Sequence, residues 1–381
     1  MQSLLRFCDA ELPWLIDSIT ALVGCESPTT DKAAVDACGR ALAARLIAMG
    51  ARVQVLPRVD AGDHLLAEFG YGPRQVLVLG HVDTVWPIGE LRRQPLRRDG
   101  ERIYGPGVYD MKAGLAIAML AVRALAASPQ GIPGRIVFLV TSDEETGSAS
   151  SRSVIEHEAR QSTAVFVMEP GLPGGALKTA RKGCGQYILR VSGVAAHAGV
   201  EPERGASAIL ELARLVVALP QLADAAAGLT LNVGTIRGGT RPNVVPDDAV
   251  AAVDVRVMST ADAARIDASL RALRVHDPRT SIEVTGGFER PPLERTPAVA
   301  GLFRQAQAVA AELGRCLEEG ATGGGSDGNF TAALGIPTLD GLGAVGGEAH
   351  AIGEHVEIAS LPWRAALVAG LLQRILTDYT G

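Results

Sequence analysis

Seven acidic and imidazole side chains in this chain have the types and the spacing that a pair of divalent metal ions needs. Each lies at or just past the end of a short apolar run, and in chain order they are His81, Asp83, Asp110, Glu144, Glu145, Glu169 and His350. Two such ions need hard carboxylate and imidazole ligands that converge from several segments, and a further carboxylate that stays free to move protons. The set therefore predicts a two-metal hydrolytic centre.

The first pair of these residues follows an apolar strand. His81 ends the segment LVLGH, and Asp83 comes two residues later. Ligands of open α/β sheets bind at the carboxyl ends of strands, and residues i and i+2 of an extended stretch share a face. His81 can therefore bind a metal while Asp83 fixes its ring. A solvated histidine beside a capping aspartate has the same local pattern.

The next three acids also have two readings. Asp110 follows Gly105 and Gly107 at the entrance to an expected helix, where it is either an N-cap or a carboxylate that bridges two ions. Glu144 and Glu145 follow a second apolar strand, in VFLVTSDEETGS. Adjacent acids repel one another in a cleft unless cations are near, so this segment is either a metal site or a solvated surface loop.

Two later segments complete the set. Glu169 directly follows a third apolar strand, in AVFVMEP, and His350 lies in a late loop, in GGEAHAIGEH. A single loop histidine is usually no more than solvated. Here, however, three strand ends each carry an acid or an imidazole, and a late loop adds a second imidazole. This combination favours a metal centre over the separate interpretations as a helix cap, a surface loop and solvated histidines.

Apolar strands alternate with helical patterns on either side of a different central region. Two helices are expected in the first 50 residues, and strands and helices then alternate up to residue 168. This alternation predicts an α/β fold with a mostly parallel sheet sandwiched by helices. Residues 183–287 instead read β-α-β-β-α-β, which predicts an inserted ferredoxin-like α+β domain. The expected catalytic domain is thus 1–182 with 288–381.

The bulk composition excludes several classes of protein. Of the 381 residues, 47% are hydrophobic and 20% are charged, as in ordinary globular domains. The net charge of −6 provides no basic footprint for nucleic acid, and no apolar run is long enough for a membrane span. No signal peptide is expected at the N-terminus. The five cysteines include no C-x-x-C pair, which favours reduced thiols in a cytoplasmic protein and argues against a thiolate zinc site.

The quoted segments, together with GPGVYDMKAG around Asp110, match in order and spacing the motifs of a known family. Over essentially its full length the chain resembles the zinc-dependent amidohydrolases that include glutamate carboxypeptidase, acetylornithine deacetylase, succinyl-diaminopimelate desuccinylase and the aminoacylases. Among these it is most similar to glutamate carboxypeptidase. The resemblance implies a zinc exopeptidase-like catalytic domain that holds two Zn²⁺ ions, with Co²⁺ and Mn²⁺ as alternatives.

The same resemblance implies a role for each of the seven residues. Five would be metal ligands, of which two bind one zinc, two bind the other and one bridges both. In that order they are His81 with Glu169, Glu145 with His350, and Asp110. Asp83 would orient His81, and Glu144 would be the general base and acid that moves the proton.

Further residues are expected to contact substrate. His197, in VSGVAAHAG, would polarise the scissile carbonyl in the partner subunit of a homodimer formed through the insert, unless it is a solvated loop histidine. Asn243, in GGTRPNVVP, resembles a position that contacts substrate at the dimer interface, unless it is a turn asparagine. Arg290, in GFERPP, resembles the arginine that holds the substrate carboxylate, unless it is a hinge residue. The glycine run around Gly324, with Ser326, can add N–H donors for the same carboxylate.

These residues leave three functions open. The first is a dizinc carboxypeptidase that releases a C-terminal amino acid, such as glutamate, from small peptides or N-acyl amino acids. The second is an N-acyl-amino-acid deacylase of the acetylornithine deacetylase, desuccinylase or aminoacylase type. The third, a catalytically inactive relative kept for binding or dimerisation, conflicts with the intact ligand set. The segment LKTARKGCG does not reproduce the lysine and serine by which glutamate carboxypeptidase holds a glutamate side chain, so the leaving amino acid stays open.

Overall fold

The computed structural model describes residues 1–377 and divides the chain into two compact units. Unit 1 comprises Met1–Ala180, Glu294–Ala321 and the residues from Ser326 onward, whereas unit 2 comprises Arg181–Leu293 with Thr322–Gly325. Each unit encloses its own hydrophobic core. No helix among residues 1–377 combines the length and the apolar character that a membrane crossing requires.

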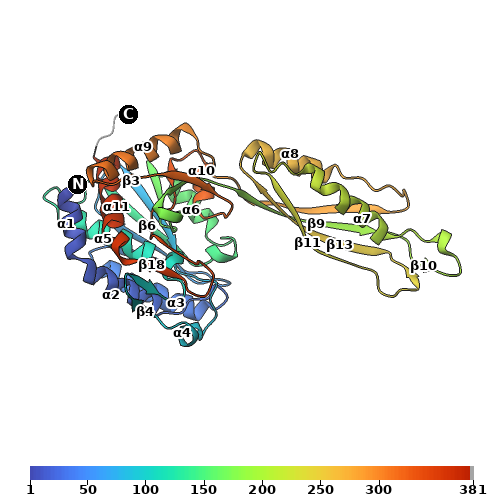
Figure 1. The fold of residues 1–381 in the computed structure, drawn as a ribbon, viewed down its shortest axis with the longest axis horizontal. Helices are drawn as coiled ribbons and strands as arrows, with labels where there is room; N and C mark the ends of the chain where they lie inside the picture. The colour runs from blue at the N-terminus through green and yellow to red at the C-terminus, as the bar shows by residue number, and fades with distance from the viewer. Residues whose placement is uncertain (378–381) are drawn as a thin grey trace. The chain divides into compact units, whose positions relative to one another are not determined.

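The core of unit 1 is a six-stranded sheet with the order β1-β2-β6-β3-β7-β16. Its strands β3 and β6 are labelled in Figure 1. The strands are β1 (Arg52–Leu56), β2 (His64–Phe69), β3 (Gln75–His81), β6 (Arg135–Thr141), β7 (Ala164–Val167) and β16 (Thr338–Leu339). Strands β6, β3, β7 and β16 run parallel to one another, and β2 and β1 continue the sheet as antiparallel strands at one edge. The predicted fold class, a mostly parallel sheet with helices, is confirmed.

Alternate residues of the central strands pack against different sets of helices. Val76 and Val78 of β3 belong to the main core, whereas Leu77 and Leu79 belong to a second cluster. The main core includes α2 (Leu12–Val23), α5 (Ala113–Ala126) and α11 (Leu361–Leu376), and the second includes α6 (Arg152–Arg160) and α10 (Gly328–Ala333). Because strand side chains alternate between faces, both faces of the sheet are buried, and the strands read as unbroken apolar runs.

The N-terminal part of unit 1 has one helix more than the sequence predicted. Other helices of unit 1 are α1 (Gln2–Ala10), α3 (Lys32–Ala48), α4 (Glu90–Arg93) and α9 (Pro297–Glu312). The expectation of two helices in the first 50 residues was wrong because it missed α1. Its apolar residues Leu4, Leu5, Phe7 and Cys8 pack in the core, but the helix has only nine residues and ends just before α2, so no clear boundary separates the two in the sequence.

Close packing of α5 against the end of β7 brings two functional segments together. A Cβ atom at Gly114 would lie 2.0 Å from the Met168 carbonyl oxygen, so only glycine permits this approach. The helix that follows Asp110 is thereby held against the segment that carries Glu169.

A small antiparallel sheet of unit 1, with the order β17-β18-β5-β4, connects two loops. Its strands are β4 (Arg97–Asp99), β5 (Arg102–Tyr104), β17 (Gly346–Gly347) and β18 (His355–Glu357). Strand β5 precedes Asp110 in the chain, and β18 follows His350. The pairing of His355 with Tyr104 therefore ties the two loops to each other.

Unit 2 contains a four-stranded antiparallel sheet with the order β11-β13-β9-β14. Its strands are β9 (Gly183–Ser192), β11 (Thr230–Gly238), β13 (Asp248–Val257) and β14 (Ser281–Arg290), and its helices are α7 (Ala208–Ala218) and α8 (Thr260–Arg271). The burial of β9 alternates along the strand, because one face of the sheet packs against the two helices in a separate core. The chain order of these elements is β-α-β-β-α-β.

Arg364, on α11, fastens two loops of unit 1 from inside the core. Its side chain is fully buried, and burial lowers the pKa of Arg364 to about 10, so the guanidinium is still charged near neutral pH. It donates to the carbonyl oxygens of Gly343 (2.7 Å), Gly175 (2.9 Å) and Gly341. Gly343 in turn donates its amide to the Glu169 carbonyl (2.9 Å), so this clamp supports a segment that carries a candidate metal ligand.

We expect Arg364→Met to lower the free energy of unfolding by at least about 3 kcal/mol, because a buried acceptor without a partner costs about 1–3 kcal/mol and three carbonyls would lose theirs. Urea unfolding followed by circular dichroism measures the change. The control is Arg374→Met on the same helix, where a partly exposed arginine pairs with Glu312 and should contribute no more than about 1 kcal/mol. Equal stability losses in the two variants would contradict the stabilising role of the hydrogen bonds from Arg364 to the three carbonyls.

Candidate metal centre

Three neighbouring parallel strands of unit 1 deliver the first side chains of the site to one edge of the sheet. The central strand β3 ends at His81, β6 ends three residues before Glu144, and β7 ends two residues before Glu169. The carboxyl ends of parallel strands meet at the same edge, which is where open α/β sheets place ligands. Buried backbone pairing of the apolar strands thus fixes where these polar side chains emerge.

The five residues expected to be metal ligands form two groups that share one carboxylate. In the first group, the Nε2 atom of His81 lies 3.3 Å from Oδ1 of Asp110 and 3.4 Å from Oε1 of Glu169. In the second, the Nε2 atom of His350 lies 3.3 Å from Oδ2 of Asp110 and 3.4 Å from Oε1 of Glu145. Within each group the three candidate ligand atoms lie within 4.8 Å of one another. Asp110 therefore offers one oxygen to each group.

The atoms at the centre of this arrangement fit divalent cations. Among the described residues, Nε2 of His81, Oδ1 of Asp110 and Oε1 of Glu145 are buried and have no hydrogen-bond partner. Buried polar atoms without partners are rare because they are costly, and one cation in each group would satisfy all three. Two ligands at about 2.0–2.1 Å from a tetrahedral Zn²⁺ lie roughly 3.3 Å apart, which agrees with the observed separations. The donor set of imidazoles and carboxylates suits zinc as well.

The charges of the two groups are strongly coupled. Burial alone would lower the pKa of His81, but its contacts with Asp110, Asp83 and Glu169 raise that pKa well above the usual value. Contacts with Asp110 and Glu145 raise the pKa of His350 to about 10. Although burial opposes ionisation of Asp110, the two imidazoles hold its pKa well below the usual range. The carboxylates thus favour protonated, positively charged imidazoles. A bound cation would replace the protons on the imidazole nitrogens.

Asp83 positions two parts of the site at once. It is fully buried, and its backbone carbonyl lies 3.0 Å from Nδ1 of His81, whereas its carboxylate is farther from that atom, at 3.5 Å. The carboxylate accepts hydrogen bonds from the amides of Glu144 (3.4 Å) and Glu145 (3.2 Å), and from the hydroxyl of Thr29 (2.8 Å). Asp83 therefore orients the His81 ring mainly through its carbonyl, and it anchors the acidic turn through its side chain.

Glu144 belongs to the same short 3₁₀ turn as Glu145, the turn η2 (Glu144–Thr146), but to neither three-residue group. It is half-buried, next to a candidate ligand, on a backbone held by Asp83. This is the placement that a proton-transferring carboxylate beside a metal centre needs. Lys178, which is also buried, lies 3.8 Å from Oε2 of Glu169. No role in the metal centre was predicted for this lysine.

The two unit 2 residues expected at the substrate lie side by side. His197 is in β10 (Ala196–His197), which pairs with β12 (Val244–Val245), and the amide of Ala198 donates to the Asn243 carbonyl (3.1 Å). Both side chains are exposed. The amide of Gly199 donates to Nδ1 of His197 (3.1 Å), so the neutral ring carries its proton on Nε2. An N–H donor at Nε2 could polarise a substrate carbonyl. The roles of His197 and Asn243 in substrate binding stay predictions.

The remaining candidate residues for substrate lie near the glycine loop. Arg290 is buried at the end of β14 and pairs in register with Cys184, and the Gly325 backbone packs against its side chain. The carbonyl of Gly324 accepts a hydrogen bond from Arg181 (3.2 Å).

Ser326, in unit 1, is fully buried. Its amide donates to Asn329 (2.9 Å) and its hydroxyl donates to Asp340 (2.6 Å). The Ser326 amide, which was expected to donate to substrate, is therefore already bonded to a side chain of unit 1.

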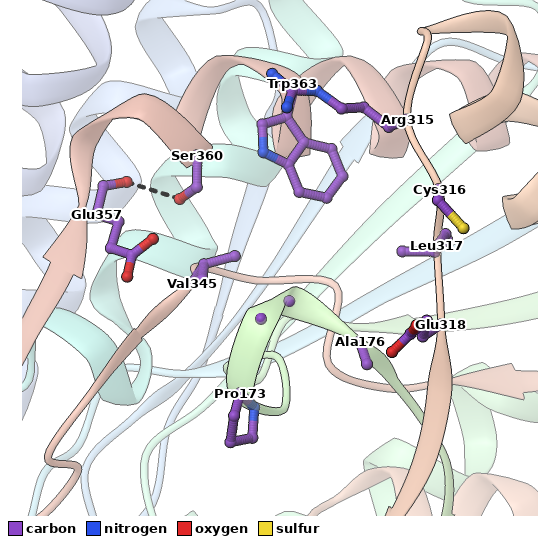
Figure 2. A pocket seen from close by; sticks show the side chains of 12 residues that line it. Pro173, Ala176, Arg315, Cys316, Leu317, Glu318, Val345, Glu357, Ser360 and Trp363 are labelled. Atoms are coloured by element: carbon purple, nitrogen blue, oxygen red, sulfur yellow. Dashed lines mark hydrogen bonds between the residues drawn. The ribbon is translucent and has the colours of Figure 1, made fainter.

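A pocket of about 410 Å³ in unit 1 is separate from the metal centre (Figure 2). Trp363, Glu357 and Glu318 line it, and the guanidinium of Arg315 lies over the Trp363 ring at 5.9 Å. None of the five candidate ligands takes part in its lining. This pocket therefore does not mark the candidate site. The site is identified by the two groups of acids and imidazoles that converge on Asp110.

We expect metal analysis by inductively coupled plasma mass spectrometry to find two divalent ions per chain, and His350→Ala to retain one. The reason is that this change leaves His81, Asp110 and Glu169 in place. His157→Ala, on the exposed side of α6, is the control and should keep both ions. Retention of two ions by His350→Ala would contradict the second three-residue group.

Comparisons with known proteins point to one family. The family model described as peptidase family M20/M25/M40 matches residues 77–374. The chain is 31% identical to carboxypeptidase G2 of Pseudomonas sp. (strain RS-16), covering 95% of this chain and 89% of that protein. It is 30% identical to succinyl-diaminopimelate desuccinylase of Stenotrophomonas maltophilia (strain K279a), covering 95% of this chain and 99% of that protein.

Solved structures share the fold. The aminopeptidase PepT of Bacillus cereus superimposes with a TM-score of 0.78 at 24% identity, covering 96% of this chain and 98% of the other. The YXEP protein of Bacillus subtilis, described as a dinuclear metal binding peptidase, superimposes with a TM-score of 0.73 at 16% identity, with the same two coverages of 96% and 98%. At these identities the likeness concerns the architecture alone.

Proposed function

The chain belongs to peptidase family M20/M25/M40, and from this premise we propose that it is a dizinc carboxypeptidase that cleaves the amide bond next to a free carboxylate. A hydrolytic metalloenzyme of the carboxypeptidase type is what the family and the relatives support. The observation that carries the proposal is the sharing of Asp110 between the two three-residue groups of candidate ligands. Zn²⁺ is the proposed metal because of its affinity for imidazole and carboxylate, with Co²⁺ and Mn²⁺ as substitutes.

The metal pair and the acidic turn have separate tasks in the proposed reaction. Ions held by the two groups would supply Lewis-acid activation of water and of the amide carbonyl. Glu144 takes the proton from the attacking water and delivers it to the leaving nitrogen. Asp83 keeps this carboxylate in place through the amide hydrogen bond to the turn and, through its carbonyl, keeps Nε2 of His81 directed at the ligand group. The inactive-relative alternative has no support from these intact contacts.

The substrate contacts of unit 2 are the second part of the proposal. Arg290 would bind the substrate carboxylate, and its buried position favours a charge-assisted, bidentate contact. The proton on Nε2 of His197 would stabilise the developing oxyanion, and Asn243 would add a contact beside it. We infer that a homodimer formed through unit 2 brings this histidine to the partner's metal centre. Small peptides and N-acyl amino acids are the proposed substrates, and neither nucleic acid nor membrane is a proposed partner.

The proposed location is the cytoplasm. The described cysteines (Cys8, Cys25, Cys38, Cys184 and Cys316) are all free, which supports a reducing compartment.

A deacylase that releases an amine from an N-acetyl or N-succinyl amino acid is the second candidate. The observation that favours it is the desuccinylase relative, which is 30% identical to this chain, against 31% for the carboxypeptidase relative. Both reactions cleave an amide near a carboxylate, so the metal centre serves either. The difference lies in the acyl side of the amide, which is a peptide or a larger acyl group in the first reaction and an acetyl or succinyl group in the second.

The deciding experiment is a substrate panel on zinc-loaded protein. We expect the specificity constant to fall at least about 100-fold when the C-terminal carboxylate of an N-acyl amino acid is capped as an amide, because a charge-assisted hydrogen-bond pair contributes about 3 kcal/mol. Arg290→Met should erase most of this discrimination, whereas Arg237→Met, an exposed change in the same unit, should not. Faster cleavage of N-acetylornithine or of N-succinyl amino acids than of dipeptides or folyl-glutamate would instead identify a deacylase.

We expect Glu144→Gln to lower kcat by about three orders of magnitude or more while both ions stay bound, because the variant keeps the shape of the side chain and loses its proton transfer. Steady-state kinetics and metal analysis on the same sample measure the two effects. Glu156→Gln, on the surface of α6, serves as the control. Comparable turnover of the Glu144 variant and the wild type would contradict the acid–base role.

A further inference from the structure

Glu354 is a buried acid to which neither the family resemblance nor the proposed reaction gives a role. It lies four residues after His350 and is 1% exposed. Each of its carboxylate oxygens accepts two hydrogen bonds. Oε2 accepts from the Gly107 amide (2.8 Å) and the Trp86 indole (2.7 Å), and Oε1 accepts from the amides of Tyr109 (2.8 Å) and Asp110 (3.0 Å).

These four donors belong to segments that carry ligands of the metal centre. Trp86 follows His81 by five residues, and the three amides belong to the turn that ends at Asp110. Glu354 itself belongs to the loop of His350, and its backbone carbonyl also accepts the amide of Gly105 (3.1 Å). One side chain therefore joins three ligand-bearing segments that are far apart in sequence.

The backbone of the His350 loop needs such an anchor. His350 and Glu348 both have left-handed φ values, of 62° and 61°. This conformation costs roughly 1–2 kcal/mol for a residue other than glycine, so it persists only where the surroundings enforce it. Local hydrogen bonds from Ala351 to the Glu348 carbonyl (3.0 Å) and from Glu354 to the Ala351 carbonyl (3.2 Å) link the strained residues to the anchored carboxylate.

We propose that Glu354 is a positioning residue that sets the separation of Asp110 and His350, and with it the affinity of the second ion. The inference rests on the proposed two-metal function. In the second group, Glu354 holds both ends, since it binds the Asp110 amide and anchors the loop of His350. In the first group, His81 and Glu169 are held at the ends of sheet strands, so that group depends less on Glu354.

Glutamine is the informative replacement. It keeps the size of the side chain but replaces one carboxylate oxygen with an NH₂ group. This group would face N–H donors and could not accept their hydrogen bonds. The matched control is Glu158→Gln. Glu158 is also a buried glutamate of unit 1, but its partner is Gln75, at the opposite end of β3 from His81 (Nε2 to Oε2, 3.3 Å). General destabilisation by a buried Glu→Gln change would appear in both variants.

The experiment is stepwise titration of metal-free protein with Zn²⁺ by calorimetry, repeated with Co²⁺ by absorption. His350→Ala identifies which binding step belongs to the second group. We expect Glu354→Gln to weaken that step by about 10–100-fold, the range seen when residues that support metal ligands are changed, and to leave the first step at its wild-type affinity. Glu158→Gln should leave both steps unchanged.

Wild-type affinities for both ions in Glu354→Gln would overturn the proposal, as would equal weakening of both ions. If this variant does not fold, Trp86→Phe decides the matter, because it removes one of the four donors from a partly buried position. A selectively weaker second ion then supports the proposal, and unchanged affinities reject it. Should the wild type itself bind fewer than two ions, the proposed function fails first, which distinguishes the two failures.

Discussion

The structure of unit 1 depends on one electrostatic constraint, which is the burial of several carboxylates around two imidazoles. Asp83, Asp110, Glu145 and Glu169 all approach His81 or His350 within 3.5 Å. Like charges at such distances in a medium of low dielectric repel strongly, and an uncompensated buried charge costs several kcal/mol. The group is stable only if positive charge is present, either as protons on the imidazoles or as bound cations. The chemistry of the site follows from this deficit of positive charge.

The scaffold holds the ligands in place against this repulsion. Parallel strands whose two faces are both buried fix the positions of His81 and Glu169, because any slip of register would expose apolar side chains. Segments without such strands depend on polar anchors instead. Asp83 holds the acidic turn, Glu354 holds the loops of Asp110 and His350, and Arg364 holds the loop that contacts Glu169. The centre thus combines rigid strand ends with loops that buried charges fasten.

Much of the site could be predicted because strand ends leave a local signal. An unbroken apolar run followed by His81, by Glu145 or by Glu169 identifies both the strand and the edge at which its polar side chain emerges. The fold class followed from the same alternation and is confirmed. His350 has no such local signal, and it was favoured over a solvated histidine by its combination with the three polar strand ends and by its place in a family-like segment.

The parts that the sequence did not reveal depend on contacts between distant residues. Glu354 stands in the segment that was quoted for His350, but its four donors lie 244 or more positions away, and no periodicity marks them. The short strands β4, β5, β17 and β18 have two or three residues each, too few for an alternating pattern. Ser326 was read as a donor to substrate because it follows glycines, although Asp340 and Asn329 occupy its donors.

The order in which unit 1 is assembled has a consequence for biosynthesis. Its first segment ends at Ala180, and the next begins at Glu294, after all of unit 2 except Thr322–Gly325 has been made. A nascent chain that has left the ribosome as far as unit 2 already has β3, β6 and β7 with three of the ligands on or just past their ends, but it has no imidazole for the second group. Full metal loading therefore has to wait until translation has passed residue 350, and a prematurely terminated chain would expose an acidic, half-built centre to the quality-control machinery.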